Sequence, residues 1–361
     1  MKIGIITFHF AFNYGAALQA FAMQEHLCSM GHDAFIIDYS PEYHTKIYSH
    51  GRTWKSCFQL PIWRIPLRIM AKIFRNYDNY RSKNFITFSK KNFKLYPYNP
   101  NSDFSEFDCI LLGSDQIWRQ DLTNNTFDGP YYGDGFKCRV FSYAASNKAT
   151  SLNEEEANNY RAKLKQLTHI GVREPMLQSL LQPLTDKKIN LNVDPTLLAG
   201  TEVYASMDLQ RLVHEKYILL YMIPHRPEVF RLAKKYADQN NLKFICLVDL
   251  PNSRLTKYYD QIAGPKEFLS YIKFAECIFT TSFHGTALSL LFNKQFYSVR
   301  QHTSADIRLE SILEQVGLLD RFIEVESSPI PKEIDYATVN SKLSELRVTS
   351  QTYLESAIIN Q

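Results

Sequence analysis

Short apolar runs alternate with helical patterns along most of the chain. The first part has an Ile-rich apolar run at 2–8, apolar residues at helical spacing over 16–30, Gly31, and a second apolar run at 34–39. Short apolar runs bounded by turn residues are typical of buried strands, and apolar residues three and four apart are typical of helices. Strand, helix and strand in this order predict the opening of a parallel α/β sheet.

The same alternation continues in two series. In the first series, we predict further strands at 109–112, 140–144, 170–172 and 189–193, and helices at 154–167 and 175–184. In the second series, we predict strands at 217–222, 243–248, 277–281 and 295–299, and helices at 228–240, 266–274, 286–292 and 305–316. Each series is long enough for a sheet covered on both faces, so the fold class is α/β, with two Rossmann-like domains facing a cleft.

The two series also suggest where the domains meet. We expect an N-terminal domain over 1–200, a C-terminal domain over 201–335 and a helix in the last segment, 336–361. The helical pattern at 336–359 fits a helix that closes the second domain, and it fits equally one that returns to the first. No uncharged apolar run of about 18 residues occurs, so we predict no membrane-spanning segment.

Composition narrows the class of protein. Apolar residues make up 45% of the chain, which predicts a large core, and a net charge of +4 over 361 residues is too weak to indicate a nucleic-acid binder. The six cysteines form no C-x-x-C pair and have no His at ligand spacing. We therefore expect no metal site, no disulfide framework and a reducing cytoplasm. His9 and Asn13 interrupt the apolar start, which we interpret as a first strand and turn, not a signal peptide.

The charge is unevenly distributed. The segment 46–94 holds twelve Lys or Arg and a single acidic residue, so it carries +11, and the rest of the chain carries −7 to give the total of +4. Within it, 64–75 has the pattern of an amphipathic helix with one basic face. This helix either lies on an anionic membrane surface or packs its apolar face on a sheet with its basic face solvated. Both interpretations stay open.

Polar residues follow several predicted strands, at the edge where open α/β sheets bind ligands. Asn13 and Tyr14 follow the first strand, and Asp115 and Gln116 follow the strand at 109–112. Asn13 and Asp115 each have two interpretations, which are contact with a polar substrate and a plain helix cap. Arg173 follows the strand at 170–172, where it is placed either to hold a carboxylate or phosphate or to pair with an acidic neighbour.

The sharpest candidate follows the strand at 277–281. His284 lies in the turn Ser282-Phe283-His284-Gly285-Thr286, just before a predicted helix. A glycine lets the backbone approach a ligand, and a helix start offers N–H groups to an anion. A histidine beside them can donate a proton near neutral pH or bind phosphate when charged. Further positive charge for this pocket can come from Arg300, His302 and Arg308.

The ordered set of these segments resembles a known family, polysaccharide pyruvyl transferase. The matching segments are IGIITFHFAFNYGAALQAFAMQEHL, GHDAFIIDYSP, LLGSDQIW, FSYAAS, GVREP, NVDPTLL, FTTSFHGTALSLLFN and RLESILEQVGL. The resemblance covers essentially the whole chain, and the order makes it more specific than any one segment. It implies a fold like that of GT-B glycosyltransferases, phosphoenolpyruvate as donor, a pair of sugar hydroxyls as acceptor, and no cofactor.

The resemblance also implies residue roles. Arg173 and His284 match positions that the family uses for the donor and for proton transfer. Together with the turns above, we predict as catalytic residues His284, Arg173 and Asp115. We predict as donor-binding residues Ser282, Gly285, Thr286, Arg300 and Arg308. We predict as acceptor-binding residues Asn13, Tyr14 and Gln116. The spacing does not choose between Arg300 and Arg308 as the family's basic residue after the histidine.

Other functions remain open at this point. A nucleotide-sugar glycosyltransferase has the same two-domain architecture, and a carbohydrate-binding protein without turnover keeps the same cleft. For a pyruvyl transferase, we expect a glycan acceptor, such as a lipid-linked precursor of a surface or capsular polysaccharide, and no nucleic-acid partner. The expected location is cytoplasmic, on the inner face of the membrane if the segment 46–94 binds anionic lipid.

Overall fold

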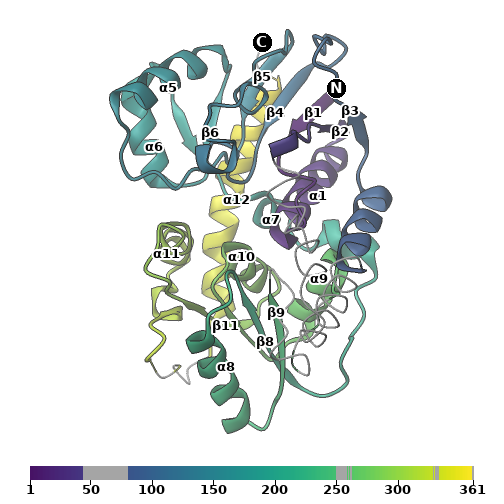
Figure 1. The fold of residues 1–361 in the computed structure, drawn as a ribbon, viewed down its shortest axis with the longest axis vertical. Helices are drawn as coiled ribbons and strands as arrows, with labels where there is room; N and C mark the ends of the chain where they lie inside the picture. Colours follow the sequence, from purple (N-terminus) through teal and green to yellow (C-terminus); the bar gives the residue numbers. More distant parts are fainter. Residues whose placement is uncertain are drawn as a thin grey trace, which may run out of the picture.

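The computed structural model describes residues 1–43, 80–248, 258, 260, 262–327, 329 and 333–359. In these ranges the chain builds two five-stranded parallel sheets, one above the other in Figure 1, and a small two-stranded sheet. The first sheet contains β1 (Lys2–Ile6), β2 (Asp33–Asp38), β3 (Leu95–Pro97), β4 (Cys109–Leu112) and β5 (Arg139–Ser142). The small sheet contains β6 (Ile170–Val172) and β7 (Ile189–Leu191). The other five-stranded sheet contains β8 (Tyr217–Met222), β9 (Lys243–Val248), β10 (Cys277–Thr280), β11 (Gln295–Val299) and β12 (Phe322–Ile323).

Helices connect these strands and cover the sheets. Those of the first series are α1 (Tyr14–Ser29), α5 (Glu154–Gln166), α6 (Pro175–Leu181) and α7 (Pro195–Leu198). Those of the second series are α8 (Pro227–Gln239), α9 (Pro265–Phe274), α10 (Phe283–Leu291), α11 (Asp306–Val316) and finally α12 (Tyr336–Ile359). The predicted fold class is confirmed, since both series form parallel sheets with helical crossovers.

Strand order fixes where ligands can approach. The first sheet runs β3-β2-β1-β4-β5, and the second runs β12-β11-β10-β8-β9. In an open parallel sheet, ligands bind where the strand order reverses, because the flanking crossovers leave on opposite faces there. The reversal lies between β1 and β4 in one sheet and between β8 and β10 in the other. The turns after these four strands are therefore the expected site.

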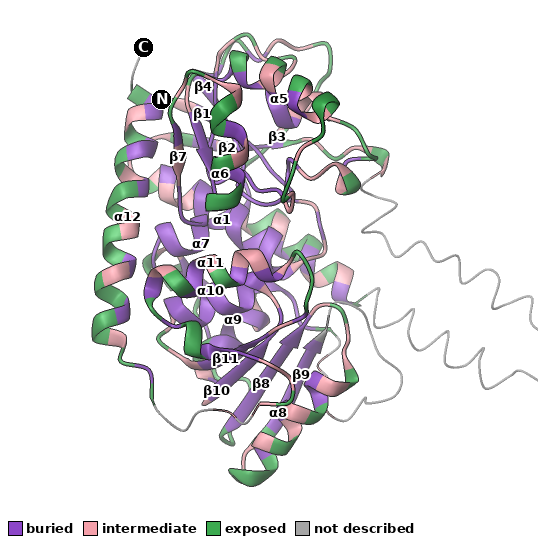
Figure 2. Cartoon of the chain, turned by 90° about the vertical axis from the view of Figure 1, so that its left-hand side faces the viewer, coloured by how far each residue is buried: buried purple, intermediate pink, exposed green. Residues whose placement is uncertain are grey.

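One core continues between the two large sheets. A single cluster of buried apolar residues includes Ile3 and Leu111 of the first sheet together with Leu219 and Ile278 of the second. Figure 2 shows the buried helices α1, α7, α9 and α10 between the sheets. Helix α7 packs against α1, α10 and α12. The two α/β units thus share an apolar interface.

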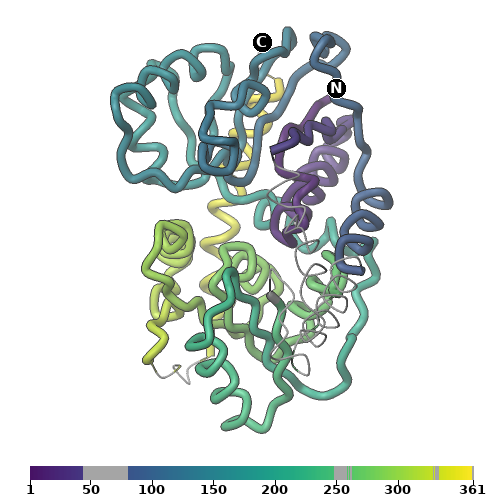
Figure 3. Tube along the Cα trace, viewed as in Figure 1, coloured from purple at the N-terminus to yellow at the C-terminus, as the bar shows by residue number. Residues whose placement is uncertain are grey.

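The last helix returns to the first unit, which settles the alternative that the sequence left open. Figure 3 shows α12, in yellow, running from the second unit up to the first sheet. The hydroxyl of Tyr353 donates to the carbonyl of Ser142, the last residue of β5, at 2.6 Å. The amide of Val193, after β7, donates to Ser350 Oγ at 3.0 Å. Leu343 near the start of α12 is buried in the shared core.

Local predictions differ from the structure in a few places. The sequence pattern does not predict the short elements β3, α7 and β12. Helix α10 begins at Phe283, before the predicted start at 286, so His284 lies in its first turn. The predicted basic helix at 64–75 lies outside the described residues. Among the described helices, none combines the length and apolar character needed to cross a membrane.

The described end of the basic segment is a helix over residues 80–92. Its side chains Phe85 and Phe88 are buried in the shared core, whereas Lys83 and Lys90 are exposed. For this part of the segment, the apolar face packs on the protein and the lysines are solvated, whereas Arg81 is buried and donates to the Phe12 carbonyl at 3.0 Å.

Candidate active site

A cleft of about 350 Å³ lies where the two sheets face each other. Its lining comes from the turns after β1, β4, β8 and β10 and from α11, as the strand order predicts. The predicted site residues that line it are Asn13, Asp115, Gln116, Ser282, His284 and Arg308. A smaller cavity of about 20 Å³ adjoins it, because Phe283 and Arg308 line both.

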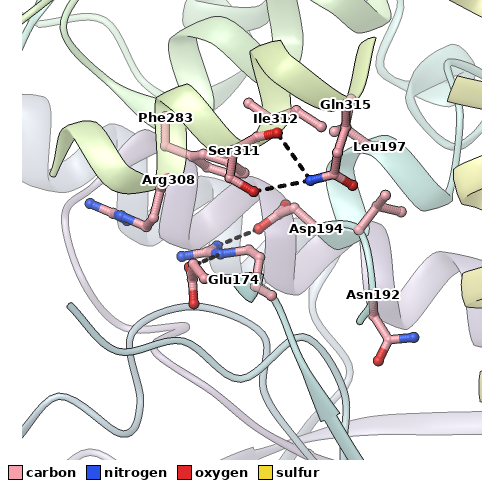
Figure 4. A pocket seen from close by; sticks show the side chains of 11 residues that line it. Glu174, Asn192, Asp194, Leu197, Phe283, Arg308, Ser311, Ile312 and Gln315 are labelled. Carbon is pink, nitrogen blue, oxygen red and sulfur yellow. Dashed lines mark hydrogen bonds and ion pairs between the residues drawn. The ribbon is translucent and has the colours of Figure 1, made fainter. Parts of the chain in front are cut away.

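Arg173 lies in the smaller cavity and is 5% exposed. Its Nη1 donates to Asp194 Oδ2 at 2.6 Å, and its Nε donates to Glu174 Oε1 at 3.1 Å. Figure 4 labels the two residues that accept these hydrogen bonds, Asp194 and Glu174, in the smaller cavity. Its Nη2 lies 3.9 Å from Asp115 Oδ1 and has no hydrogen-bond partner among the described residues. Burial opposes the charge of this guanidinium, but the three carboxylates more than offset that effect and raise the pKa of Arg173. The guanidinium therefore keeps its charge and one unpaired donor.

Asp194 is the carboxylate on which these contacts converge. It precedes Pro195, the first residue of α7, and its Oδ1 accepts hydrogen bonds from the Thr196 amide at 3.0 Å and hydroxyl at 2.8 Å. Its Oδ2 accepts from Arg173 and, at 3.3 Å, from Ser114 Oγ. Burial favours the neutral acid, but His284, Arg173 and the Thr196 amide hold the pKa of Asp194 well below its usual range. Asp194 is therefore a charged group inside the protein.

His284 comes from the other α/β unit and meets this carboxylate. Its Nε2 lies 3.5 Å from Asp194 Oδ2. Helix α1 packs against the opposite side of the ring, where a Cβ atom on Gly15 would lie only 2.0 Å from His284 Nδ1. Only glycine at position 15 permits this approach, since real Cβ contacts are essentially never shorter than 3.0 Å. The histidine is thus fixed between the two units, and its ring lines the cleft.

The two arginines that follow His284 have different environments. The guanidinium of Arg308 lines the cleft, and its buried Nε has no hydrogen-bond partner in the part of the chain that the structure describes. Burial and the neighbouring charge of Arg173 lower the pKa of Arg308 to about 10. Arg300 instead contacts Glu310 at 3.2 Å and Glu324 at 3.5 Å. The cleft is therefore lined by Arg308, and Arg300 belongs to a surface ion-pair group.

On the opposite wall, Asp115 and Gln116 extend from the end of β4. Asp115 has a positive φ of 70°, which is uncommon outside glycine, and its Oδ1 accepts a hydrogen bond from the Gln116 amide at 2.9 Å. The side chain of Gln116 accepts from Arg119 Nη1 at 3.1 Å. Its own Nε2 finds no hydrogen-bond partner within the described ranges. This wall offers a carboxylate and a free amide donor to a ligand.

Other predicted site residues have structural contacts. Asn13 lines the cleft, and its Oδ1 also caps α1 by accepting from the amide of Ala16, so both of its interpretations hold. Tyr14 is 1% exposed, stacks on Phe268 and donates to the Ala263 carbonyl at 3.0 Å. Tyr14 therefore packs between the two units and is not among the residues that line the described cleft, and its role in acceptor binding stays a prediction.

Gly285 and Thr286 also make structural contacts, and their donor-binding roles stay predictions. A Cβ on Gly285 would lie 2.2 Å from Thr280 Oγ1, so this glycine permits close packing of α10 on β10. Thr286 is fully buried, and its hydroxyl lies 2.6 Å from Ser298 Oγ. Of the predicted donor-binding residues, Ser282 and Arg308 line the cleft, and the side chain of Ser282 makes no cap hydrogen bond within described α10.

Sequence reasoning missed two residues of the site. Asp194 follows β7 and caps α7, which is the same strand-end position that singled out Arg173 and Asp115. Applying that rule to the NVDPTLL segment identifies it. Arg119 also lines the cleft, where Asp121 accepts two of its hydrogen bonds at 2.7 and 2.8 Å. No sequence signal distinguishes Arg119 from other surface arginines. Across the described residues, no group of three or more His, Cys, Asp or Glu is arranged to hold a metal ion.

Comparison with known proteins adds a family and a fold. The sequence model of the family described as polysaccharide pyruvyl transferase matches residues 13–303. No protein of curated function matched. A UDP-N-acetylglucosamine 2-epimerase from Rickettsia bellii superposes with a TM-score of 0.50 at 10% identity, covering 98% of this chain and 95% of that one. A UDP-GlcNAc 2-epimerase from Neisseria meningitidis superposes with a TM-score of 0.49 at 12% identity, covering 99% of this chain and 94% of that one. The likeness to the first shows the predicted fold.

Proposed function

Because the chain belongs to the polysaccharide pyruvyl transferase family, we propose that it transfers pyruvate from phosphoenolpyruvate to two hydroxyls of a glycan, forming a cyclic ketal. The observation that carries the choice of donor is the pair of unsatisfied guanidinium donors beside His284. These are Arg173 Nη2 and Arg308 Nε, both buried and neither hydrogen-bonded by the described residues. Buried unpaired donors are costly, so their presence indicates an anionic ligand.

Phosphoenolpyruvate fits such a site by its chemistry. Its carboxylate and phosphate sit on adjacent atoms, and binding both requires several fixed cationic donors. Arg173 and Arg308 supply two of these donors, and Ser282 with the amino end of α10 supplies further hydrogen-bond donors. The low pKa of Arg308 supports the same conclusion, because an anion would relieve the repulsion between the two guanidiniums.

The reaction then needs one acid and one base. Protonated His284 gives its proton to the methylene carbon of the enol, which becomes the methyl group, and a glycan hydroxyl attacks the resulting cationic carbon. The carbon–oxygen bond to phosphate breaks, inorganic phosphate leaves, and the second hydroxyl closes the ketal. The two hydroxyl protons balance the proton on the new methyl group and the proton on the released phosphate. Arg173 and Arg308 stabilise the charge that develops on the departing phosphate.

The opposite wall is suited to the glycan. Asp115 presents a carboxylate that can accept a hydroxyl proton, and Gln116 presents the free amide Nε2. Asn13 lies beside them at the start of α1. These contacts support acceptor binding by the first α/β unit and donor binding by the second, with Arg173 and Asp194 reaching across.

Acceptor-dependent release of inorganic phosphate tests the function. Purified protein is incubated with phosphoenolpyruvate and a panel of lipid-linked and free glycans, and in parallel with nucleotide sugars. We expect phosphate release only with phosphoenolpyruvate plus a glycan, loss of at least about a thousandfold in kcat for His284→Gln, and unchanged turnover for Arg161→Gln on the exposed face of α5. Nucleotide release without phosphate release would instead indicate a glycosyltransferase.

We also propose that the protein works in the cytoplasm at an anionic membrane surface, on a lipid-linked precursor. This rests on the +11 charge of the segment 46–94 and on the exposure of Lys83, Lys90, Lys91 and Lys94 at its described end. Co-sedimentation with anionic vesicles should then fall steeply between about 50 and 500 mM salt. The reason is that added salt shortens the Debye length and so screens the attraction between the lysines and the anionic lipids. Equal sedimentation with neutral vesicles contradicts the proposal.

A further inference from the structure

Asp194 connects the two halves of the site through a single carboxylate. It belongs to the first α/β unit, 1% exposed, and its Oδ2 faces both Arg173 of the same unit and His284 of the other. Its Oδ1 is held by the amide and hydroxyl of Thr196 at the start of α7. With one oxygen fixed to a helix start, the other has a defined direction toward the histidine.

The two nitrogens of His284 have different surroundings. Nε2 is buried, makes no hydrogen bond with the described residues and lies 3.5 Å from Asp194 Oδ2, so this carboxylate is the acceptor in reach of a hydrogen on Nε2. Nδ1 lies beside Gly15 at the start of α1, a helix start whose residues Asn13 and Ala16 line the cleft with His284. A carboxylate that accepts from one imidazole nitrogen fixes the tautomer and leaves the other nitrogen for the substrate. This geometry makes Nδ1 the nitrogen available to the cleft.

The charged groups near the histidine come from both α/β units. Asp194, before α7, lies 3.5 Å from the ring; Asp115 after β4 and Arg308 on α11 line the same cleft, and Arg173 and Glu174 after β6 pair with each other, with Arg173 also bound to Asp194. Arg119, at the cleft wall, is paired with Asp121. These five groups are three carboxylates and two guanidiniums, so one more negative than positive charge lies near the ring. Helices α1 and α10 bring Asn13, Gly15 and Phe283 against the ring, and these residues do not titrate.

We propose that Asp194 is the positioning residue for the proton donor. It binds the Nε2 hydrogen of His284, stabilises the imidazolium and thereby leaves Nδ1 as the atom that delivers the proton to the substrate. The identity of that substrate rests on the proposed function, but the contact between Asp194 and the ring does not. Because the contact crosses from one α/β unit to the other, it also makes the acid depend on the docking of the two units.

The ring nitrogens can be observed directly by ¹⁵N NMR of histidine-labelled protein without substrate. The His284 signals are assigned by their loss in His284→Gln. At pH 7 we expect the wild type to carry a proton on Nε2. In Asp194→Asn we expect that preference to be lost, and in Asp194→Glu we expect it to be largely restored. The control is Asp260→Asn, which removes a carboxylate that accepts from the amides of Ile262 and Ala263 outside the cleft. It should leave the His284 signals unchanged.

Turnover is measured on the same variants. We expect kcat to fall about a hundredfold in Asp194→Asn, to recover partly in Asp194→Glu, and to stay at the wild-type value in Asp260→Asn. An Nε2 without a proton in the wild type overturns the proposal. An unchanged His284 spectrum in folded Asp194→Asn also overturns it. If Asp194→Asn does not fold, the wild-type spectrum still tests the proposal, because it shows whether Nε2 carries a proton. Absence of turnover with phosphoenolpyruvate would refute the proposed function instead, and the spectra would still test Asp194.

Discussion

The two arginines after the histidine allow a prediction for single side chains. Arg308→Gln should raise the KM for phosphoenolpyruvate at least about tenfold, because a hydrogen bond to a charged group contributes about 1.5–3 kcal/mol. Arg308 lines the cleft with an unpaired Nε, whereas the guanidinium of Arg300 is occupied by Glu310 and Glu324. Arg300→Gln should therefore change KM less than about threefold. Steady-state kinetics at varied donor concentration checks both values, and the reverse order of effects would contradict the assignment.

These arginines also show what a sequence can predict about a site. The rule that polar residues after parallel strands meet at one edge of the sheet correctly brings Asn13, Asp115 and His284 to one cleft. The rule does not give the direction of a side chain on a following helix, so Arg300 and Arg308 look equivalent until the structure shows their partners. The rule also does not distinguish small turn residues that permit close packing from residues that contact a ligand. Gly285, for example, packs on Thr280.

At the scale of elements, the close approach of α1 and α10 can be tested at Gly15. In Gly15→Ala the new Cβ would lie 2.0 Å from His284 Nδ1 and 2.3 Å from Cγ, so the ring must move. We expect kcat to fall at least about tenfold, as displacement of a catalytic group by about 1 Å predicts. The intrinsic gain of about 1 kcal/mol for Ala in a helix should keep the variant folded. Kinetics and thermal unfolding measure the two effects separately.

The control lies at the other end of the same helix. Gly31 follows α1 with a φ of 86°, and no described atom would lie within 4 Å of a Cβ there. Gly31→Ala should therefore lower the free energy of unfolding by about 1 kcal/mol and leave kcat unchanged. Wild-type kcat in Gly15→Ala would show that the His284 ring is not held by α1.

Element boundaries show a second limit of the sequence pattern. The strands β4, β6 and β8 match their predicted ranges, because continuous apolar runs end sharply at polar turns. Helix α10 begins earlier than predicted because its N-cap Ser282 and its first-turn residue His284 are polar, and periodicity counts such residues as a loop. The short helix α7 has too few residues to show a period at all, and its caps are the only local signal.

For the whole molecule, the sequence predicts two α/β units but not how α12 joins them. Hydrophobic spacing shows that a helix has a buried face, and it does not show against which unit that face packs. In the structure, Leu343 and Leu354 of α12 belong to the same core cluster as strands of both large sheets. Hydrogen bonds from Tyr353 and to Ser350 then attach its second half to the first unit.

This shared core predicts that the two units unfold together. Leu354, fully buried on α12, should cost about 3 kcal/mol when truncated in Leu354→Ala, and calorimetry should show one transition shifted to lower temperature. Val348 on the same helix is 63% exposed, so Val348→Ala should leave the transition where it is in the wild type. Two separate transitions, of which Leu354→Ala moves only one, would show that the units are stable independently. In that case the contact between Asp194 and His284 would form only after docking, and turnover would be lost at a lower temperature than the second transition.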